Sequence, residues 1–265
     1  MKIPLCNAVN CRDIGGIATK FGVIETHRLI RCGKLDRIDS DDIYTLQQLP
    51  LKRVIDLRTN AEIANCPDVL IDGVQAKHIP IISATTFGIS YETSDGKTIA
   101  DKLQAGIVRM QSRGETPLKH MEILYASFVS DKFCRNGYGS FLKALANEPT
   151  NGATLWHCSQ GKDRVGTCTA LLLHCLGASK DSIFADYMLT NEQMQENING
   201  IVNKVSPFVS EERLQLVLSM LYVNEKFLQT FFDKIDEFFG NTDSFLNACG
   251  ITPTDIEQLR TNYIA

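Results

Sequence analysis

A cysteine and an arginine near the middle of the chain are spaced so that they could act together on a phosphoryl group. Cys158 and Arg164 stand in the stretch HCSQGKDRVG, residues 157–166. A tight loop of this length directs its backbone N–H groups inward and forms an anion-binding nest. A helix that begins near the arginine adds the positive end of its dipole, and Gly161 lets the backbone approach a ligand closely. The stretch therefore predicts a phosphate-binding loop.

The same positive loop favours the thiolate form of a cysteine, which is the nucleophilic form. Arg164 can bind two phosphoryl oxygens at once, which a lysine cannot do. The sulfur of Cys158 would then lie in line behind phosphorus, ready to attack. We expect no cofactor and no metal, and the remaining contacts to phosphate are expected from Ser159, Gln160, Gly161 and Lys162.

Lys162 is open to two interpretations. It could be a second cation over the loop, suited to substrates with more than one anionic group, or a solvated loop charge. The cysteine–arginine spacing is also weak by itself, because Cys6 and Arg12 repeat it without a glycine between them. What distinguishes the copy at 158–164 is its context, namely a strand before it, a glycine within it and an apolar helix after it.

Composition narrows the class of protein further. The chain has 265 residues, a net charge of −4 and a pI of about 5.8, which gives no basic field for nucleic acid. The nine cysteines are scattered and fit reduced thiols, and the group Cys6, Cys11 and Cys32 has no histidine at metal spacing. We find no signal peptide and no apolar run long enough for a transmembrane segment. A cytoplasmic protein is expected, with export by another route left open.

Periodicity predicts an α/β fold with a mostly parallel sheet flanked by helices. No linker divides the chain, so residues 1–265 are expected to form a single domain. Residues 83–116 combine a loop-like stretch with a polar helix, and we expect a helical lid or insertion there. The helix at 40–49 is expected to begin at an N-cap serine, Ser40, and the last helix at Thr252 and Pro253. The expected strands are 52–58, 75–81 and 153–157, and the other expected helices are 164–177, 180–189, 192–205 and 224–239.

Several further motifs resemble one known family, in the same order along the chain. HCSQGKDRVG is similar to the signature of cysteine-dependent phosphatases. Residues 7 to about 195 resemble the bacterial tyrosine phosphatases with an N-terminal Asn-Phe-Arg-Asp-Leu-Gly-Gly element, which include secreted lipid-acting enzymes of intracellular pathogens. The segments that carry this resemblance are NCRDIGGI (10–17), LIRCGKLDRIDSDDIYTLQQL (29–49), VIDLRTNAEIANCPD (54–68) and DYMLTN (186–191).

The resemblance implies a cysteine-phosphatase fold with a helical lid. It implies dephosphorylation of phosphotyrosine, often of phosphoserine or phosphothreonine, and of phosphoinositides, with inorganic phosphate as the product in the site. Asp163, within the loop, would be the general acid that protonates the leaving oxygen and then activates water. The other candidate acid is Asp56, at the carboxyl end of a predicted strand, which could instead orient the loop arginine.

Other residues are expected to support the loop. His157 would buttress it rather than transfer a proton, and Gly166 follows it in the signature. We expect Arg12, Asp13 and Arg58 to form a structural ion-pair network near the site.

The sequence departs from the family pattern at two positions. Cys11 replaces phenylalanine in the first motif, and Val165 replaces the threonine or serine that donates a hydrogen bond to the cysteine sulfur. Losing one such bond costs roughly 1.5–3 kcal/mol, or about 10- to 100-fold in the step that uses it, and Thr167 is placed too late to substitute. Two alternatives therefore remain beside a phosphatase: a phosphate-binding pseudo-phosphatase with weak turnover, and a sulfur-transfer enzyme with a similar cysteine loop.

Overall fold

A five-stranded sheet stands at the centre of the molecule, with strand order β1-β4-β7-β5-β6. The computed structural model describes residues 1–84 and 99–265. Strands β4, β7, β5 and β6 are parallel to one another, and β1 pairs antiparallel with β4. The strands are β1 (Arg12–Asp13), β4 (Leu29–Cys32), β5 (Leu51–Asp56), β6 (Gln75–His78) and β7 (Ala153–His157), and a separate hairpin joins β2 (Ala18–Thr19) to β3 (Gly22–Val23).

Strand β7 can lie in the middle of the sheet because each of its side chains is either apolar or a polar group with a partner in the interior. All five residues of β7 are buried. Its last residue, His157, pairs with Cys32 at the end of β4 and with Asp56 at the end of β5. The carboxyl ends of three parallel strands therefore meet at one edge, which is where ligands bind in open α/β sheets.

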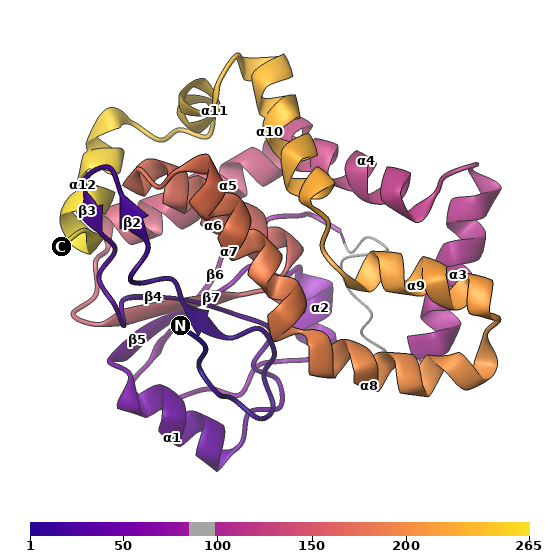
Figure 1. The fold of residues 1–265 in the computed structure, drawn as a ribbon. Helices are drawn as coiled ribbons and strands as arrows, with labels where there is room; N and C mark the ends of the chain where they lie inside the picture. Colours follow the sequence, from indigo (N-terminus) through magenta and orange to yellow (C-terminus); the bar gives the residue numbers. More distant parts are fainter. Residues whose placement is uncertain (85–98) are drawn as a thin grey trace.

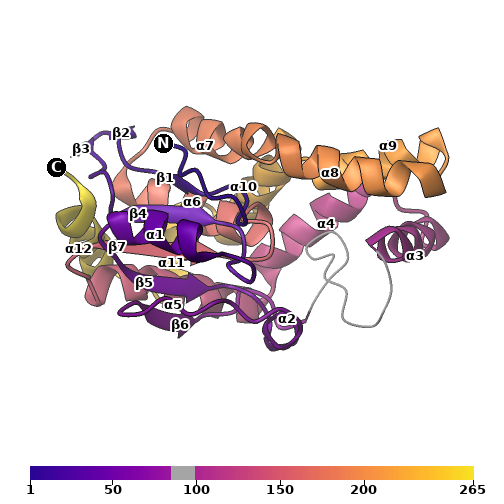
Figure 2. The ribbon, with the colours of Figure 1, turned by 90° about the horizontal axis from the view of Figure 1, so that it is seen from below.

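Helices cover both faces of this sheet (Figures 1 and 2). The larger hydrophobic core joins Trp156 of β7 to apolar residues of α4, α5, α6, α10 and α12, and the smaller core places α1 against Leu155 on the other face. The predicted α/β fold with a mostly parallel, helix-flanked sheet is confirmed. The helices are α1 (Ser40–Gln48), α2 (Asn60–Asn65), α3 (Ile99–Ser112), α4 (Pro117–Ser130), α5 (Lys132–Asn147), α6 (Asp163–Leu176), α7 (Lys180–Gln193), α8 (Gln195–Val205), α9 (Glu211–Leu221), α10 (Glu225–Phe239), α11 (Thr242–Ala248) and α12 (Pro253–Tyr263), with a 3-10 turn at Ser206–Phe208.

Element boundaries differ from the predictions where capping chemistry was misread. Helix α1 does begin at Ser40, but its N-cap is Asp39, whose carboxylate accepts hydrogen bonds from the backbone N–H groups of Asp41 and Asp42. Thr252 caps α12 as predicted, and Pro253 is its first residue. Strands β1 and β4 were not predicted, because short strands in motif-rich segments show no alternation of apolar and polar residues.

Helices α3, α8 and α9 form a lobe beside the sheet, with a hydrophobic cluster of its own (Figures 1 and 2). Ile107 and Met110 of α3 pack there against residues of α8 and α9 such as Ile198 and Val217. The predicted insertion at 83–116 lies partly outside the described residues, since 85–98 are not described. Its second half is α3, and the lobe also draws on two helices that the sequence did not associate with a lid.

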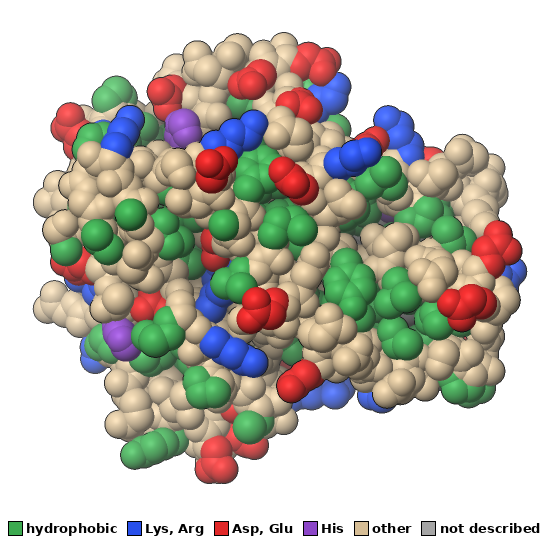
Figure 3. Space-filling model, in the orientation of Figure 1, with side chains coloured by type: hydrophobic (Ala, Val, Ile, Leu, Met, Phe, Trp, Pro, Cys, Tyr) green, Lys and Arg blue, Asp and Glu red, His purple; other side chains and the backbone are tan. Residues whose placement is uncertain are grey.

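The surface carries charges of both signs. On the face in Figure 3, acidic and basic side chains are interspersed with apolar ones, in keeping with the net charge of −4. Within residues 1–84 and 99–265, no helix combines the length and apolar character needed to cross a bilayer.

Candidate active site

The loop between β7 and α6 runs from Cys158 to Lys162 and is pressed closely against β4. Gly161 has a φ of +66°, in the left-handed region that favours glycine. A Cβ atom at this position would lie 2.5 Å from the carbonyl oxygen of Cys32. Glycine is therefore required here both by backbone conformation and by space, and the loop is held against the end of β4.

Arg164, in the first turn of α6, makes a two-pronged ion pair with Glu62 of α2. Its Nη1 and Nη2 atoms lie 2.7 and 2.8 Å from the two carboxylate oxygens, and Glu62 Oε1 also accepts a hydrogen bond of 2.7 Å from Ser159 Oγ. Burial raises the pKa of Glu62, but the hydrogen bonds and charge of Arg164 outweigh burial and lower it to about 2. Glu62 is therefore a permanent anion that fixes the guanidinium beneath the loop.

Cys158 lies next to this guanidinium and is 3% exposed. Burial lowers the pKa of Arg164, but the charges of Cys158 and Glu62 outweigh it, so the pKa is raised above its usual value. Arg164 Nε is buried and has no hydrogen-bond partner among the described residues. The Nη1 and Nη2 atoms of Arg164 are thus held by Glu62, whereas its Nε–H is available to bind a ligand.

Lys162 is turned toward the helical lobe. Its ammonium donates a 2.5 Å hydrogen bond to the backbone carbonyl of Met220, near the carboxyl end of α9, and lies 3.8 Å from Asp163 Oδ2. A cation at this end of a helix is stabilised by the helix dipole. Of the two interpretations of Lys162, a solvated loop charge is contradicted, because the residue is only 1% exposed.

Asp163 begins α6 and is held by tyrosines. Tyr125 of α4 donates a 2.8 Å hydrogen bond to Asp163 Oδ1, and its hydroxyl lies 2.7 Å from that of Tyr187 on α7. Burial and the negative charge of Asp163 raise the pKa of both tyrosines well above their usual range. A Cβ at Gly166 would lie 2.9 Å from the Tyr187 ring, so this glycine makes room for the tyrosine.

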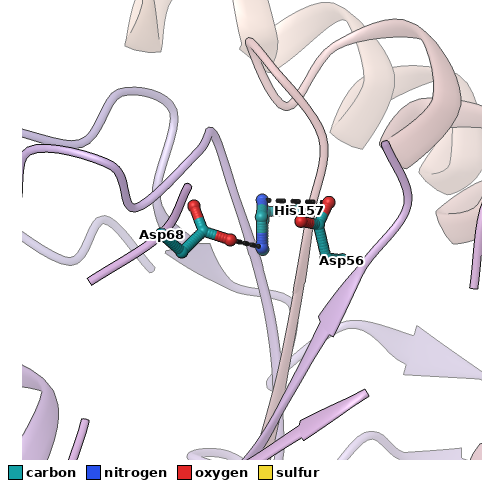
Figure 4. Close-up of side chains that lie close together, drawn as sticks. All are labelled: Asp56, Asp68 and His157. Atoms are coloured by element: carbon teal, nitrogen blue, oxygen red, sulfur yellow. Dashed lines mark ion pairs between the residues drawn. The ribbon is translucent and has the colours of Figure 1, made fainter. Parts of the chain in front are cut away.

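At the carboxyl ends of β5 and β7, Asp56 and Asp68 lie on either side of the imidazole of His157 (Figure 4). His157 Nε2 lies 3.0 Å from Asp68 Oδ2, and Nδ1 lies 4.0 Å from Asp56 Oδ1 and 3.2 Å from the carbonyl of Cys158. Burial lowers the pKa of His157, but the charge of Asp56 and the contacts with Asp68 outweigh burial and raise it. These contacts fit the buttressing role expected for His157.

Arg58 completes this cluster and determines its character. It donates to both oxygens of Asp56 and lies 2.8 Å from Asp68 Oδ2. Burial raises the pKa of Asp56, but the charge of His157 and the contacts with Arg58 outweigh burial and lower it to about 2. The ligand atoms of the two aspartates and the histidine lie within 4.8 Å of one another, as metal ligands do. The guanidinium of Arg58 already pairs with both carboxylates and places a positive charge beside them, so the residues do not fit a metal cation.

Comparison with known proteins assigns the chain to a family: a model of the tyrosine phosphatase family matches residues 3–265. The chain belongs to the tyrosine phosphatase family. It is 27% identical over 273 residues to the triple specificity protein phosphatase PtpB of Mycobacterium tuberculosis, covering 97% of this chain and 96% of that protein. It is 26% identical over 261 residues to a putative tyrosine-protein phosphatase of Cupriavidus necator, covering 97% of this chain and 86% of that one.

The phosphatase predicted from the sequence is thereby confirmed: the chain is an enzyme that hydrolyses phosphoric monoesters. A tyrosine-protein phosphatase of Nostoc commune is also similar, 24% identical over 180 residues, which are 67% of this chain and 53% of that protein.

The ion-pair network predicted for Arg12, Asp13 and Arg58 is wrong as a single network. Arg12 and Arg31 both pair with Asp186 of α7, whereas Arg58 belongs to the Asp56 cluster. Asp13 instead accepts hydrogen bonds from the backbone N–H groups of Gly15 and His27. The three residues do not meet because Arg12 and Asp13 form β1, whereas Arg58 follows β5, and these two strands lie on opposite sides of β7.

Val165 is fully buried in the core, and no nearby threonine replaces the hydroxyl that the family pattern places there. Thr167 Oγ1 contacts the carbonyls of Asp163 and Arg164 at 3.2 Å. Thr169 Oγ1 donates to the carbonyl of Val165 at 2.7 Å. Both hydroxyl hydrogens are therefore used within α6.

Sequence reasoning missed Glu62, Asp68, Tyr125 and Asp186 as site residues. Glu62 had a detectable signal, because Thr59 and Glu62 form the T-x-x-E pattern of a capping box, and the structure shows both of its hydrogen bonds. That pattern predicts the start of α2 but not the ion pair of Glu62 with Arg164. Tyr125 lies 38 positions from Asp163, and no local pattern connects the two.

Proposed function

We propose that this chain is a metal-independent protein-tyrosine phosphatase that acts through a phosphocysteine on Cys158. The thiolate attacks phosphorus, the bond from phosphorus to the substrate oxygen breaks, and that oxygen takes a proton from Asp163. The Asp163 carboxylate then takes a proton from water, whose oxygen attacks phosphorus and displaces the sulfur. Inorganic phosphate leaves, and both Cys158 and Asp163 return to their starting states.

The arginine beside the cysteine is the observation that carries this proposal. Buried polar groups in proteins are almost always hydrogen-bonded, yet Arg164 Nε has no partner among the described residues. Glu62 holds the other nitrogens in place. A phosphoryl oxygen would supply the missing acceptor and gain a charge-assisted hydrogen bond from a donor that needs no reorganisation.

The contacts favour Asp163 over Asp56 as the general acid. A general acid must carry a proton near the working pH, and a carboxyl group with a pKa of about 2 does not. Both Asp56 oxygens also accept hydrogen bonds from Arg58. Asp163 receives one neutral donor on Oδ1, and its Oδ2 lies 3.8 Å from the ammonium of Lys162.

We propose phosphotyrosine as the principal substrate, with phosphoserine, phosphothreonine and phosphoinositides as further ones, in line with the triple specificity named for PtpB. Lys162 bears on the lipid substrates. It would bind a second phosphate only after releasing the carbonyl of Met220, so opening of the α3, α8 and α9 lobe would accompany the binding of a polyanionic headgroup. Residues 1–265 would then act as one phosphatase domain with this lobe as its lid.

The test is phosphate release from p-nitrophenyl phosphate and from a phosphotyrosyl peptide, with a chelator present. Cys158→Ser should lower kcat by about 10³-fold or more, whereas Cys168→Ser, which alters a buried cysteine of α6 outside the loop, should keep most of the activity. Full activity of Cys158→Ser would refute the proposed mechanism.

A panel of phosphopeptides and phosphoinositides tests the substrate proposal. Lys162→Ala should lose more activity on the lipids than on the peptides.

Val165 favours a second candidate, a phosphate-binding pseudo-phosphatase. With no hydroxyl at this position, departure of the cysteine sulfur in the second step should be slow. We predict a burst of product on an aryl phosphate, and a 10- to 100-fold rise in steady-state turnover for Val165→Thr, from about 1.5–3 kcal/mol for one hydrogen bond to a charged group. Val165→Ala is the matched control, since it changes size without adding a donor. No burst together with unchanged turnover in Val165→Thr would contradict this account.

A further inference from the structure

Asn10, just before β1, has an unusual backbone conformation for a residue other than glycine. Its φ is +58°, in the left-handed region, and it is only 3% exposed. Residues held in this region cost conformational free energy and are retained where the surrounding structure demands them. Here the conformation places the side-chain amide between Arg12 and the phosphate loop. Its Oδ1 accepts a hydrogen bond from Arg12 Nη1, which leaves Nδ2 facing the phosphate loop.

The loop is bound from outside through three successive carbonyl groups. Asn10 Nδ2 donates to the carbonyl of Gly161 at 2.7 Å and lies 3.4 Å from that of Gln160. Arg31 Nη2 also donates to the Gly161 carbonyl, at 2.9 Å. The backbone N–H of Lys34 donates to the carbonyl of Ser159 at 3.3 Å. Among residues 1–84 and 99–265, Asn10 is the one side chain with hydrogen bonds to two of the three carbonyls.

Binding the carbonyls fixes the N–H groups as well. A trans peptide unit is planar, and its C=O and N–H point in opposite directions. With the carbonyls of Ser159, Gln160 and Gly161 directed outward to these donors, the N–H groups that follow them, on Gln160, Gly161 and Lys162, point toward the concave side of the loop. Three converging N–H groups are what an oxyanion site requires.

We propose that Asn10 is a positioning residue for the phosphate loop, one that orients its N–H groups toward the phosphoryl oxygens without touching substrate. This inference rests on the proposed function of the loop. Arg12 and Asp186 extend the arrangement, because Arg12 orients the Asn10 amide and is itself bound to Asp186. The N-terminal segment thus takes part in phosphate binding although its residues lie outside the loop.

The test is Asn10→Gly, which keeps the left-handed backbone accessible and removes only the amide. His27→Gly is the matched control: His27 has the same conformation, φ +61°, but its backbone N–H donates to Asp13 rather than to the loop. Inhibition by inorganic phosphate, kcat, KM and Tm are measured for each. We expect Asn10→Gly to weaken phosphate inhibition at least tenfold and to lower kcat/KM by about 10- to 100-fold, while His27→Gly stays within about twofold of wild type.

A phosphate inhibition constant within twofold of wild type in folded Asn10→Gly would overturn the inference. If Asn10→Gly does not fold, Asn10→Asp decides, because it keeps the shape and sets an acceptor against the Gly161 carbonyl. Phosphate should then bind at least tenfold more weakly at pH 7 and partly recover at low pH, where a protonated carboxyl can donate again. Equal weakening at both pH values would overturn the inference. Absence of phosphate competition in the wild-type enzyme would instead refute the proposed function.

Discussion

Two aspartates flank the phosphate loop, and they are held by opposite kinds of partner. Asp56, at the end of β5, is bound by the guanidinium of Arg58 and lies near the imidazole of His157. Asp163, at the start of α6, is bound on Oδ1 by the neutral hydroxyl of Tyr125, and the ammonium of Lys162 lies farther away, 3.8 Å from Oδ2. Both are at least nine-tenths buried, so their difference comes from their partners and not from exposure.

Partners of opposite kind suit the two carboxylates to different tasks. Cations next to Asp56 stabilise its charge, which makes it a fixed structural anion whose pKa is about 2. A neutral donor next to Asp163 positions the group without adding a full positive charge on that oxygen. The role of a buried carboxylate close to a reactive cysteine is therefore set by the groups that surround it, as is generally true of acid and base pairs.

Exchanging each aspartate for asparagine gives the largest expected effect. Asp163→Asn should lower kcat on phenyl phosphate by about 10²- to 10⁴-fold, the usual contribution of a general acid, with little change in Tm. Asp56→Asn should lower kcat less than about tenfold but destabilise the fold, because the buried Arg58 charge loses its partner. Steady-state kinetics and thermal unfolding separate the two. A larger kcat loss for Asp56→Asn would reverse the assignment.

The Asp56 cluster also predicts how stability depends on pH. The folded-state pKa of Asp56, about 2, lies below its ordinary value of 3.8, so its contribution of about 2 kcal/mol is present above pH 4 and lost as pH falls toward 2. His157 has the opposite sign: its raised pKa stabilises the fold below about pH 6.5 and less so as pH rises. Denaturant unfolding at pH 2.5–8 measures both. In Asp56→Asn, the free energy of unfolding should fall less steeply below pH 4. An unchanged pH dependence in this range would contradict the stabilising role of the Asp56 charge.

The sequence was sufficient for the loop and for the strand and helix that flank it, because these depend on local signals. The strand at 153–157, Gly161 and the apolar helix after Arg164 follow one another directly, and periodicity and turn chemistry act over that range. The structure places all three as predicted.

What escaped prediction depends on contacts between distant segments. Glu62 reaches Arg164 across 102 positions, and Met220 reaches Lys162 across 58. Neither contact has a periodic signal, because each is created only when helices pack on the sheet. The same holds for Asn10, whose left-handed conformation has meaning only beside Gly161, 151 positions away.

Tyr125→Phe gives the smallest predicted effect and the sharpest test of how Asp163 is held. Removing one neutral donor to a carboxylate costs about 1.5 kcal/mol, so kcat should fall about tenfold on phenyl phosphate. The loss should shrink for p-nitrophenyl phosphate, whose leaving group needs less protonation. Tyr138→Phe is the control, because its hydroxyl donates to Thr167 and not to Asp163. An equal loss on both substrates would show that Tyr125 supports the fold of α6 rather than the alignment of the acid, and the contrast between the two aspartates would then rest on Asp56 alone.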